Sequence, residues 1–186
     1  MGRHTMTIAG LNRRFGTDAA ALAPAVAHSD QIRAVFGGFP AAVVALCAEI
    51  GGSPYGMIAT SLTVGVSYDP PMALFSAHND SSTWPVLKTA GRIGASVLAE
   101  HQSAACHQLA AKGVDRFADL DIHTTPHGPL FIEGASSWMD CEITGELPAG
   151  DHTIITFRIH QIGHSPHTPL IYHNGHFPRI HHDHNP

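Results

Sequence analysis

The sequence predicts a mainly β protein, a closed or nearly closed β-barrel with short flanking helices. Apolar segments of strand length recur about seven or eight times, at spacings of roughly 10–20 residues. The chain of 186 residues contains 18 glycines and 13 prolines, which suits the many turns of such a fold. No regular alternation of strand-like and helix-like segments is present, and this disfavours a parallel sheet built from βαβ units.

The first predicted element is a short helix. It begins after Ser29, which has the side chain of an N-cap, and ends at Gly37-Gly38. Its apolar residues have the spacing of one helical face, which we expect to be buried: Ile32, Val35 and Phe36.

Two extended segments follow and predict a hairpin. Residues Ala41–Ala48 form an apolar run, and Tyr55–Thr63 resume an extended pattern. The turn residues Gly51–Pro54 between them predict a loose loop. Asp69-Pro70-Pro71 then excludes a helix, and Met72–Ala77 is the next expected strand.

The second half of the chain adds helices and further strands. Helices are expected over Trp84–Thr89, with Thr83 as its cap, and over Gln102–Lys112. The strands are expected at Ile93–Ala99, Leu130–Ile132, Ser137–Thr144 and Thr153–Ile162. The last of these alternates between two faces, as a half-buried strand does.

The length indicates one domain, which we expect over residues 29–178. Residues 1–28 have no clear periodicity and are expected to form a partly disordered arm. A transit peptide is the alternative, because three arginines precede the first acidic residue. Residues 179–186 form a histidine-rich tail.

Charge and composition exclude several classes of partner. The formal net charge is −5, the only lysines are Lys88 and Lys112, and no basic run occurs, so nucleic acid and anionic membranes are not expected. No apolar run approaches the ~18 residues of a membrane helix. Three widely spaced cysteines indicate reduced thiols in a cytoplasmic protein rather than disulfides or a zinc site: Cys47, Cys106 and Cys141.

Histidine is the unusual residue of this composition. The sixteen histidines are spread from His4 to His184 and form no single motif. The group His181-His182-Asp183-His184 has imidazoles of the kind that bind zinc or nickel, but the spacing is a poor metal signature and a solvated tail is the favoured interpretation. We predict no physiological metal, and a histidine-rich metal-binding protein is kept as an alternative.

A polar loop is the most informative local feature. It holds Asn79, Ser81, Ser82 and Thr83, follows a predicted strand and precedes a predicted helix. Free N–H groups at a helix N-terminus attract an anion, and hydroxyls add hydrogen bonds, so the loop suits a phosphate. Capping alone also selects these residues. Upstream, Gly56–Thr63 is small and polar, which either lets a ligand approach the backbone or marks a solvent-exposed strand edge.

A set of ordered motifs resembles the flavin reductase family from about Ile32 to Phe177. The matching segments occur in the order that the family shows. They are Ser53-Pro54-Tyr55-Gly56-Met57, Thr60-Ser61-Leu62, Val66-Ser67-Tyr68-Asp69-Pro70-Pro71, Asn79-Asp80-Ser81-Ser82-Thr83, Gly91, Ser96-Val97-Leu98-Ala99, Gln102, Asp115-Arg116-Phe117, Gly134-Ala135, Trp138-Met139-Asp140-Cys141, Gly150-Asp151-His152 and Pro169-Leu170-Ile171-Tyr172-His173-Asn174-Gly175.

The resemblance implies a fold, an activity and partners. The family has the FMN-binding split β-barrel, usually as a homodimer. Its members oxidise NADH or NADPH, reduce FMN or FAD, and pass the reduced flavin to a flavin-dependent monooxygenase. This chemistry asks little of side chains, because the coenzyme carries the hydride step. That is consistent with the lack of a catalytic triad, paired carboxylates or a GxGxxG motif.

The resemblance also implies roles for individual residues. Along the flavin ring it places Thr60, Ser61, Leu62 and Ser67, with Val97, Leu98 and Ala99 on the next strand. At the ribityl chain and phosphate it places Asn79, Ser81, Ser82 and Thr83, with Arg116 and Phe117 closing the site. It assigns His152 to the nicotinamide nucleotide, as the one candidate catalytic residue, and Tyr172 is expected to help there.

The sequence departs from the family at three places. Ser96 stands where asparagine is common, Ala41-Ala42 replaces a Thr-Gly pair, and Asn174 and His176 replace basic residues. The last change makes binding of a 2′-phosphate less expected and favours NADH. A flavin-binding protein of the same fold that does not use a nicotinamide is a further alternative.

Overall fold

A computed structural model describes residues 24–180. The chain divides into two compact units, one up to Gly38 and one from Phe39 onward. Most of the predicted arm lies outside the described residues, and so does most of the histidine-rich tail. The division into arm, domain and tail therefore stays a prediction.

Within the first unit, the predicted N-terminal helix is present as α2 (Asp30–Gly37). The Ser29 hydroxyl accepts a hydrogen bond from the Ile32 N–H at 3.2 Å, which is the N-cap that the sequence predicts. None of the helix residues is buried, and Val35 and Phe36 are largely exposed. Within the described part of this unit the helix finds no partner that buries its apolar face, so the expected burial stays a prediction.

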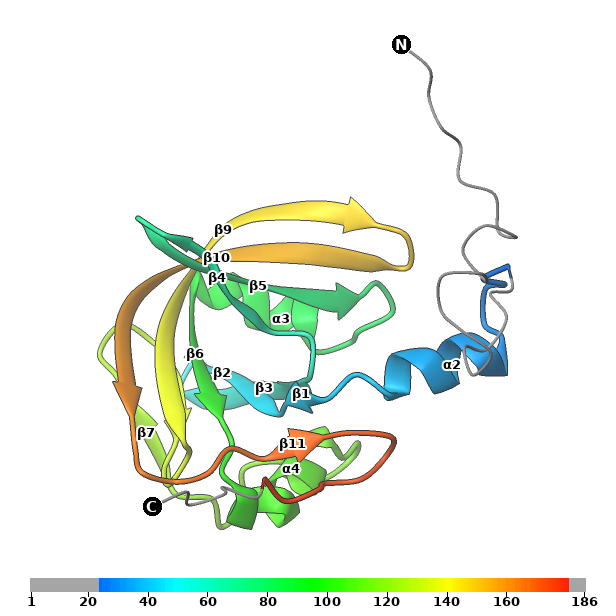
Figure 1. Cartoon of the computed structure of the whole chain (residues 1–186). Coiled ribbons are helices and arrows are strands. Elements are labelled where there is room, and N and C mark those ends of the chain that lie inside the picture. Colours follow the sequence, from blue (N-terminus) through cyan, green and yellow to red (C-terminus); the bar gives the residue numbers. More distant parts are fainter. Residues whose placement is uncertain (1–23, 181–186) are drawn as a thin grey trace. The chain divides into compact units, whose positions relative to one another are not determined.

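The second unit is built on one curved antiparallel sheet of seven strands (Figure 1). The strands are β2 (Val44–Ile50), β3 (Ser53–Ala59), β4 (Thr63–Tyr68), β5 (Pro71–His78), β6 (Arg92–Val97), β9 (Ser137–Ala149) and β10 (His152–His164). Their order across the sheet is β3-β2-β6-β9-β10-β5-β4. The mainly β class is thus confirmed.

Smaller elements complete the unit. The helices are α3 (Trp84–Leu87), η1 (Lys88–Ala90), η2 (Glu100–Gln102) and α4 (Ser103–Ala110). Two short pairs of strands are β1 (Ala41–Ala42) with β11 (Ile171–Tyr172), and β7 (Ile122–Thr124) with β8 (Leu130–Ile132). Strands β4, β7 and β11 were not predicted from the sequence.

The hairpin of β2 and β3 closes more tightly than expected. Ile50 pairs directly with Ser53, so the turn holds only Gly51 and Gly52, both with positive φ. Two successive residues with positive φ form the kind of two-residue turn that fits the twist of a hairpin. The predicted loose loop was therefore wrong, because Ser53 and Pro54 already belong to the strand.

The curved sheet encloses the main core. Its buried side chains include Leu46 of β2, Phe75 of β5 and Phe157 of β10, together with Trp84 and Leu87 from α3. Since this cluster joins Ala59 of β3 to Phe75 of β5, from opposite halves of the sheet, the sheet curls into a barrel against which α3 packs. Within the described chain no ladder joins the end strands β3 and β4, so the barrel is split there.

A second core lies on the opposite face of β2. Val43, Ala45 and Cys47 pack there with Cys106 and Leu109 of α4, beside residues of β8. Strand β2 is consequently buried on both faces, which explains why its sequence is a continuous apolar run rather than an alternating one.

In the described part of the chain, no helix has the length and apolarity needed to cross a membrane.

Candidate functional site

Two neighbouring cavities lie between β3, α3 and the segment after α4. The first has a volume of about 320 Å³ and is lined by Pro54, Tyr55 and Gly56 of β3. The second has about 230 Å³ and is lined by Met57 and Ile58 of the same strand. Both cavities share three polar residues, Ser82, Thr83 and Arg116, which we call the cradle. The structure thus brings together Ser82 and Thr83, expected at the ribityl chain and phosphate, and Arg116, expected to close the site.

Arg116 is fixed in place by three backbone or side-chain acceptors. Its Nε donates to the Ala111 carbonyl at 2.7 Å, and its Nη1 donates to the Gly56 carbonyl at 3.0 Å and to the Thr83 hydroxyl at 3.1 Å. Among the described residues, no carboxylate forms an ion pair with it. A positioned guanidinium without a counter-charge is suited to bind a phosphate.

The helix after the polar loop spans the predicted residues, but only its first turn is α-helical, because the 3₁₀ turn η1 follows α3 at once. α3 has four residues, and its N-terminal Trp84 N–H is capped by the Ser81 hydroxyl at 3.1 Å rather than by Thr83. A single α-helical turn has little macrodipole, so we expect this helix to contribute little to the attraction of an anion. Arg116, with Lys112 on the wall of the second cavity, supplies the positive charge instead.

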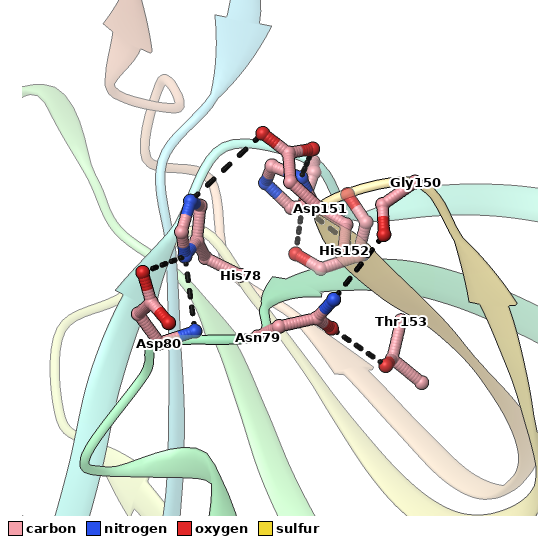
Figure 2. A network of polar contacts seen from close by, with 9 residues as sticks. His78, Asn79, Asp80, Gly150, Asp151, His152 and Thr153 are labelled. Atoms are coloured by element: carbon pink, nitrogen blue, oxygen red, sulfur yellow. Dashed lines mark hydrogen bonds and ion pairs between the residues drawn. The ribbon is translucent and has the colours of Figure 1, made fainter.

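A cluster of two histidines and two aspartates adjoins the second cavity through Asp80 (Figure 2). His152 at the start of β10 is paired with His78 at the end of β5, and their ring centroids are 5.0 Å apart. Asp80, which lines the second cavity, donates its N–H to the Nδ1 of His78 at 3.1 Å. The cluster is therefore continuous with the cavity wall.

Asp151 lies between the two rings. Its Oδ1 is 2.7 Å from the Nδ1 of His152, and its Oδ2 is 3.9 Å from the Nε2 of His78. Because a carboxylate only accepts, the Nδ1 of His152 carries a proton, and Nε2 is the acceptor of the neutral ring. The hydrogen bond from His152 lowers the pKa of Asp151 below its ordinary value.

Asn79 is engaged by the β9–β10 hairpin rather than by the cradle. Its Nδ2 donates to the Gly150 carbonyl at 3.3 Å, and its Oδ1 accepts from the Thr153 hydroxyl at 3.0 Å (Figure 2). Its backbone N–H donates to the Asp151 carbonyl at 2.9 Å. These contacts give Asn79 a role in holding the turn that carries His152, and leave its predicted contact with phosphate as a prediction.

The residues expected along the ring lie in two places. Thr60, Ser61 and Leu62 connect β3 to β4, and the Ser61 hydroxyl both accepts from the Ser76 N–H and donates to the Ser76 carbonyl. Ser67 and Val97 line a different, apolar groove of about 480 Å³ between β4, β5, β9 and β10. The structure does not bring these two residues to the cradle.

Three further predicted residues lie away from the two cavities. Leu98 and Ala99 are fully buried, and their N–H groups donate to the Val43 carbonyl and to Gln102. Tyr172, on β11, packs its ring against Phe177. Ser96, the departure from the family's asparagine, is also buried, and its hydroxyl accepts the Ile132 N–H of β8 at 3.0 Å.

Sequence reasoning missed several residues of the site. Lys112 was read only as the end of a helix, although it is one of two lysines in the chain. His78 had no assigned role, and only the pairing of β5 with β10 places it beside His152. Tyr55 and Val114 line the first cavity with Phe117, and nothing in their spacing indicates that these distant residues converge.

The side chains present fit the phosphate end of a flavin. The cradle and the adjoining wall provide three hydroxyls, a guanidinium and an ammonium group, which are donors that phosphate oxygens accept from. Within residues 24–180, no group of three or more His, Cys, Asp or Glu side chains converges as metal ligands. The tail histidines from His181 onward lie outside the described residues.

A split barrel with a cradle whose donors fit a phosphate is an arrangement suited to binding a flavin. Residues 36–181 match the flavin reductase like domain family, and the chain belongs to that family. A flavin reductase of Pseudomonas putida is 34% identical over 131 residues, which are 70% of this chain and 76% of that protein. An NADH:FMN oxidoreductase of Rhodococcus erythropolis is 32% identical over 153 residues, 79% of each chain.

Solved structures agree with this assignment. The NADH:FAD oxidoreductase of Streptomyces globisporus, in complex with NAD and FAD fragments, is 30% identical and superposes with a TM-score of 0.79 over 88% of this chain and all of that one. The flavin reductase component of a bacterial two-component tryptophan halogenase is 28% identical, with a TM-score of 0.73 over 80% of this chain and 95% of that one. The predicted family and its split-barrel fold are confirmed.

Proposed function

We propose that this protein is an NAD(P)H:flavin oxidoreductase that reduces FMN or FAD and supplies the reduced flavin to a separate oxygenase. The cradle carries this proposal within the structure, because Arg116 is fixed without a counter-charge between two cavities. The family membership supports the reaction, and relatives named as reductase components of monooxygenases support the partner.

The protein's own contribution is binding and orientation. When bound, the flavin ring accepts a hydride from the nicotinamide. The cradle and Lys112 would hold the phosphate, and the wall formed by Met57 and Ile58 leads from it toward Thr60–Leu62, where the ring is expected. Holding two rings at reacting distance replaces a bimolecular encounter with an oriented one, and this is the main source of rate that the site offers.

His152 is proposed to contact the nicotinamide nucleotide. Its Nδ1 is held by Asp151, and its ring is about two-fifths exposed, so that Nε2 remains available to a ligand. Asn79 and His78 support it from β5, through the hairpin turn and the ring contact. His152 would act by positioning the hydride donor, and the proposal assigns it no proton transfer.

We also propose that the protein is a homodimer. The apolar groove that holds Ser67 and Val97 is bordered by Tyr68 and Ile162, which are 88% and 80% exposed. Large apolar side chains around one groove support contact with a second copy. In such a dimer, Ser67 and Val97 would lie at the interface, where the resemblance expects the flavin ring.

A cytoplasmic location is proposed from the cysteines. All three are free and buried, and burial raises the pKa of Cys47 and Cys141 to about 12. Such thiols are inert and fit a reducing compartment.

One experiment tests the activity directly. The purified full-length chain is mixed with FMN or FAD and NADH under anaerobic conditions, and the visible absorption of the flavin is followed. We expect bleaching of the flavin with oxidation of an equal amount of NADH. If neither flavin is bleached by NADH or NADPH while flavin still binds, the protein is a flavin-binding module, and the proposal of a reductase is wrong.

A further inference from the structure

The first cavity lies beyond the cradle, on the side away from the residues expected along the flavin ring. Along β3, the residues of the second cavity, Met57 and Ile58, lie on the side of Thr60–Leu62, and those of the first cavity, Pro54–Gly56, lie on the other side of the cradle. The opposite wall has the same order, from Asp80 in the second cavity to Val86 in the first. A ligand that runs from the ring end through the second cavity thus reaches the cradle before it reaches the first cavity.

FMN ends at its phosphate, whereas FAD continues through a second phosphate to an adenosine. If the phosphate of the flavin lies at Ser82, Thr83 and Arg116, FMN leaves the first cavity unfilled. An adenosine group would enter it directly. The cavity has a volume of about 320 Å³, at the lower end of the range of roughly 300–1,000 Å³ that is typical of small-molecule sites.

The first cavity also has the lining that a purine prefers. Tyr55, Val86 and Val114 are 38%, 37% and 58% exposed, and all three border this one cavity with Phe117. Aromatic side chains stack on nucleobases, and apolar neighbours exclude water from the stacked face. Asp115 lies on the same wall and offers a carboxylate to an exocyclic amine.

We propose that the cavity lined by Tyr55, Val86, Val114 and Phe117 is an adenosine subsite, and that the protein therefore binds FAD more tightly than FMN. This inference rests on the proposed function, because it takes the cradle to be the phosphate site of the flavin. It adds the identity of the preferred flavin and the residues that select it.

The test is equilibrium binding of FAD and FMN to the full-length protein, followed by quenching of flavin fluorescence or by calorimetry. For the unmodified chain we expect a Kd for FAD about tenfold lower than that for FMN, which corresponds to about 1.4 kcal/mol. Tyr55→Ala and Val114→Glu should bring the ratio of the two constants close to one by weakening FAD alone. Tyr55→Phe keeps the aromatic ring and should keep the preference.

Each other outcome counts against the subsite. Equal affinity for the two flavins in the unmodified chain would overturn it, as would a Tyr55→Ala variant that weakens FMN as much as FAD. If Tyr55→Ala leaves both flavins unchanged and raises the KM for NADH, the cavity takes the adenosine of the dinucleotide instead. If one of these contrary results is found while FMN still binds and is reduced normally, the subsite is wrong and the proposed function stands. If neither flavin binds to the unmodified chain, the subsite and the proposed function are both wrong.

Discussion

Arg116 joins three separate parts of the fold, and its side chain is the charge at the centre of the cradle. We predict that Arg116→Ala weakens FMN binding by about ten- to a hundredfold, since hydrogen bonds to charged groups contribute about 1.5–3 kcal/mol. Riboflavin has the same ring but no phosphate, so its affinity should change little. A comparable loss for both compounds, measured by fluorescence titration, would assign Arg116 to the support of the fold rather than to the phosphate.

His152 offers a second prediction at the level of single side chains. His152→Ala should lower kcat/KM for NADH by about ten- to a hundredfold while the Kd of the flavin is unchanged. Stopped-flow reduction of bound flavin over a range of NADH concentrations separates the two effects. A variant that loses flavin affinity instead would place His152 on the coenzyme rather than on the hydride donor.

Asp151 has a pKa below its ordinary value of 3.8, chiefly because His152 donates to it. A depressed carboxyl pKa adds stability that is present above the unfolded value and is lost as the pH falls through the folded value. We predict that Asp151→Asn lowers the Tm slightly at pH 5–7, and that the difference from the unmodified chain shrinks below pH 3.8. Thermal unfolding followed by circular dichroism measures it. A difference that stays constant with pH would contradict this account.

Single residues show which parts of the site a sequence can predict. Ser82, Thr83 and Arg116 belong to motifs whose order matches the family, and they converge as expected. Lys112 and Tyr55 reach the same cavities through the packing of α4 and the tight turn of β3, and such convergence has no local signal. His78 comes next to His152 only through the register of two strands that are far apart in the chain.

At the level of elements, close approach of strands constrains β6. A Cβ on Gly94 would meet the carbonyl oxygen of Leu130 and lie 2.8 Å from its carbonyl carbon, both backbone atoms of β8. We predict that Gly94→Ala destabilises the fold by about 1–3 kcal/mol or more, because β8 has to move. In thermal unfolding we expect the Tm of this variant to fall by about 3–10 °C.

Gly145→Ala is the matched control for Gly94. Its added Cβ would lie 3.1 Å from the Thr156 hydroxyl, a side-chain atom that can shift. We expect a much smaller change in Tm from this substitution. If the two variants unfold at the same temperature, the close approach of β6 and β8 does not limit stability.

The elements also explain why some sequence predictions succeeded and others did not. The apolar runs that become β2, β5, β6 and β10 are long enough to be recognised, and all four are present. The loop at Gly51–Pro54 was read as loose because glycine and proline are common in loops, whereas here Gly51 and Gly52 alone make the turn. The length of β9 was underestimated, since its last residues before the hairpin turn, 146–149, are exposed and lack an apolar pattern.

For the whole molecule, the exposed groove along β4, β9 and β10 predicts self-association. The unmodified chain should have about twice its chain mass of 19.7 kDa in solution, and Ile162→Asp should reduce it to a monomer. Leu147→Asp, at an exposed position of β9 that does not line the groove, is the control. Light scattering after gel filtration reports both masses. A monomeric unmodified chain would remove the basis for a dimer.

The shortness of α3 has a consequence for how long the coenzyme stays. Peptide dipoles buried in a fold are poorly screened by electrolyte, but Lys112 is exposed and Arg116 lines open cavities. Attraction that depends on such accessible cations weakens as ionic strength rises. The residence time of the flavin on the protein should therefore shorten with added potassium chloride. A reduced flavin that has to diffuse to a separate oxygenase needs a binding site that releases it readily.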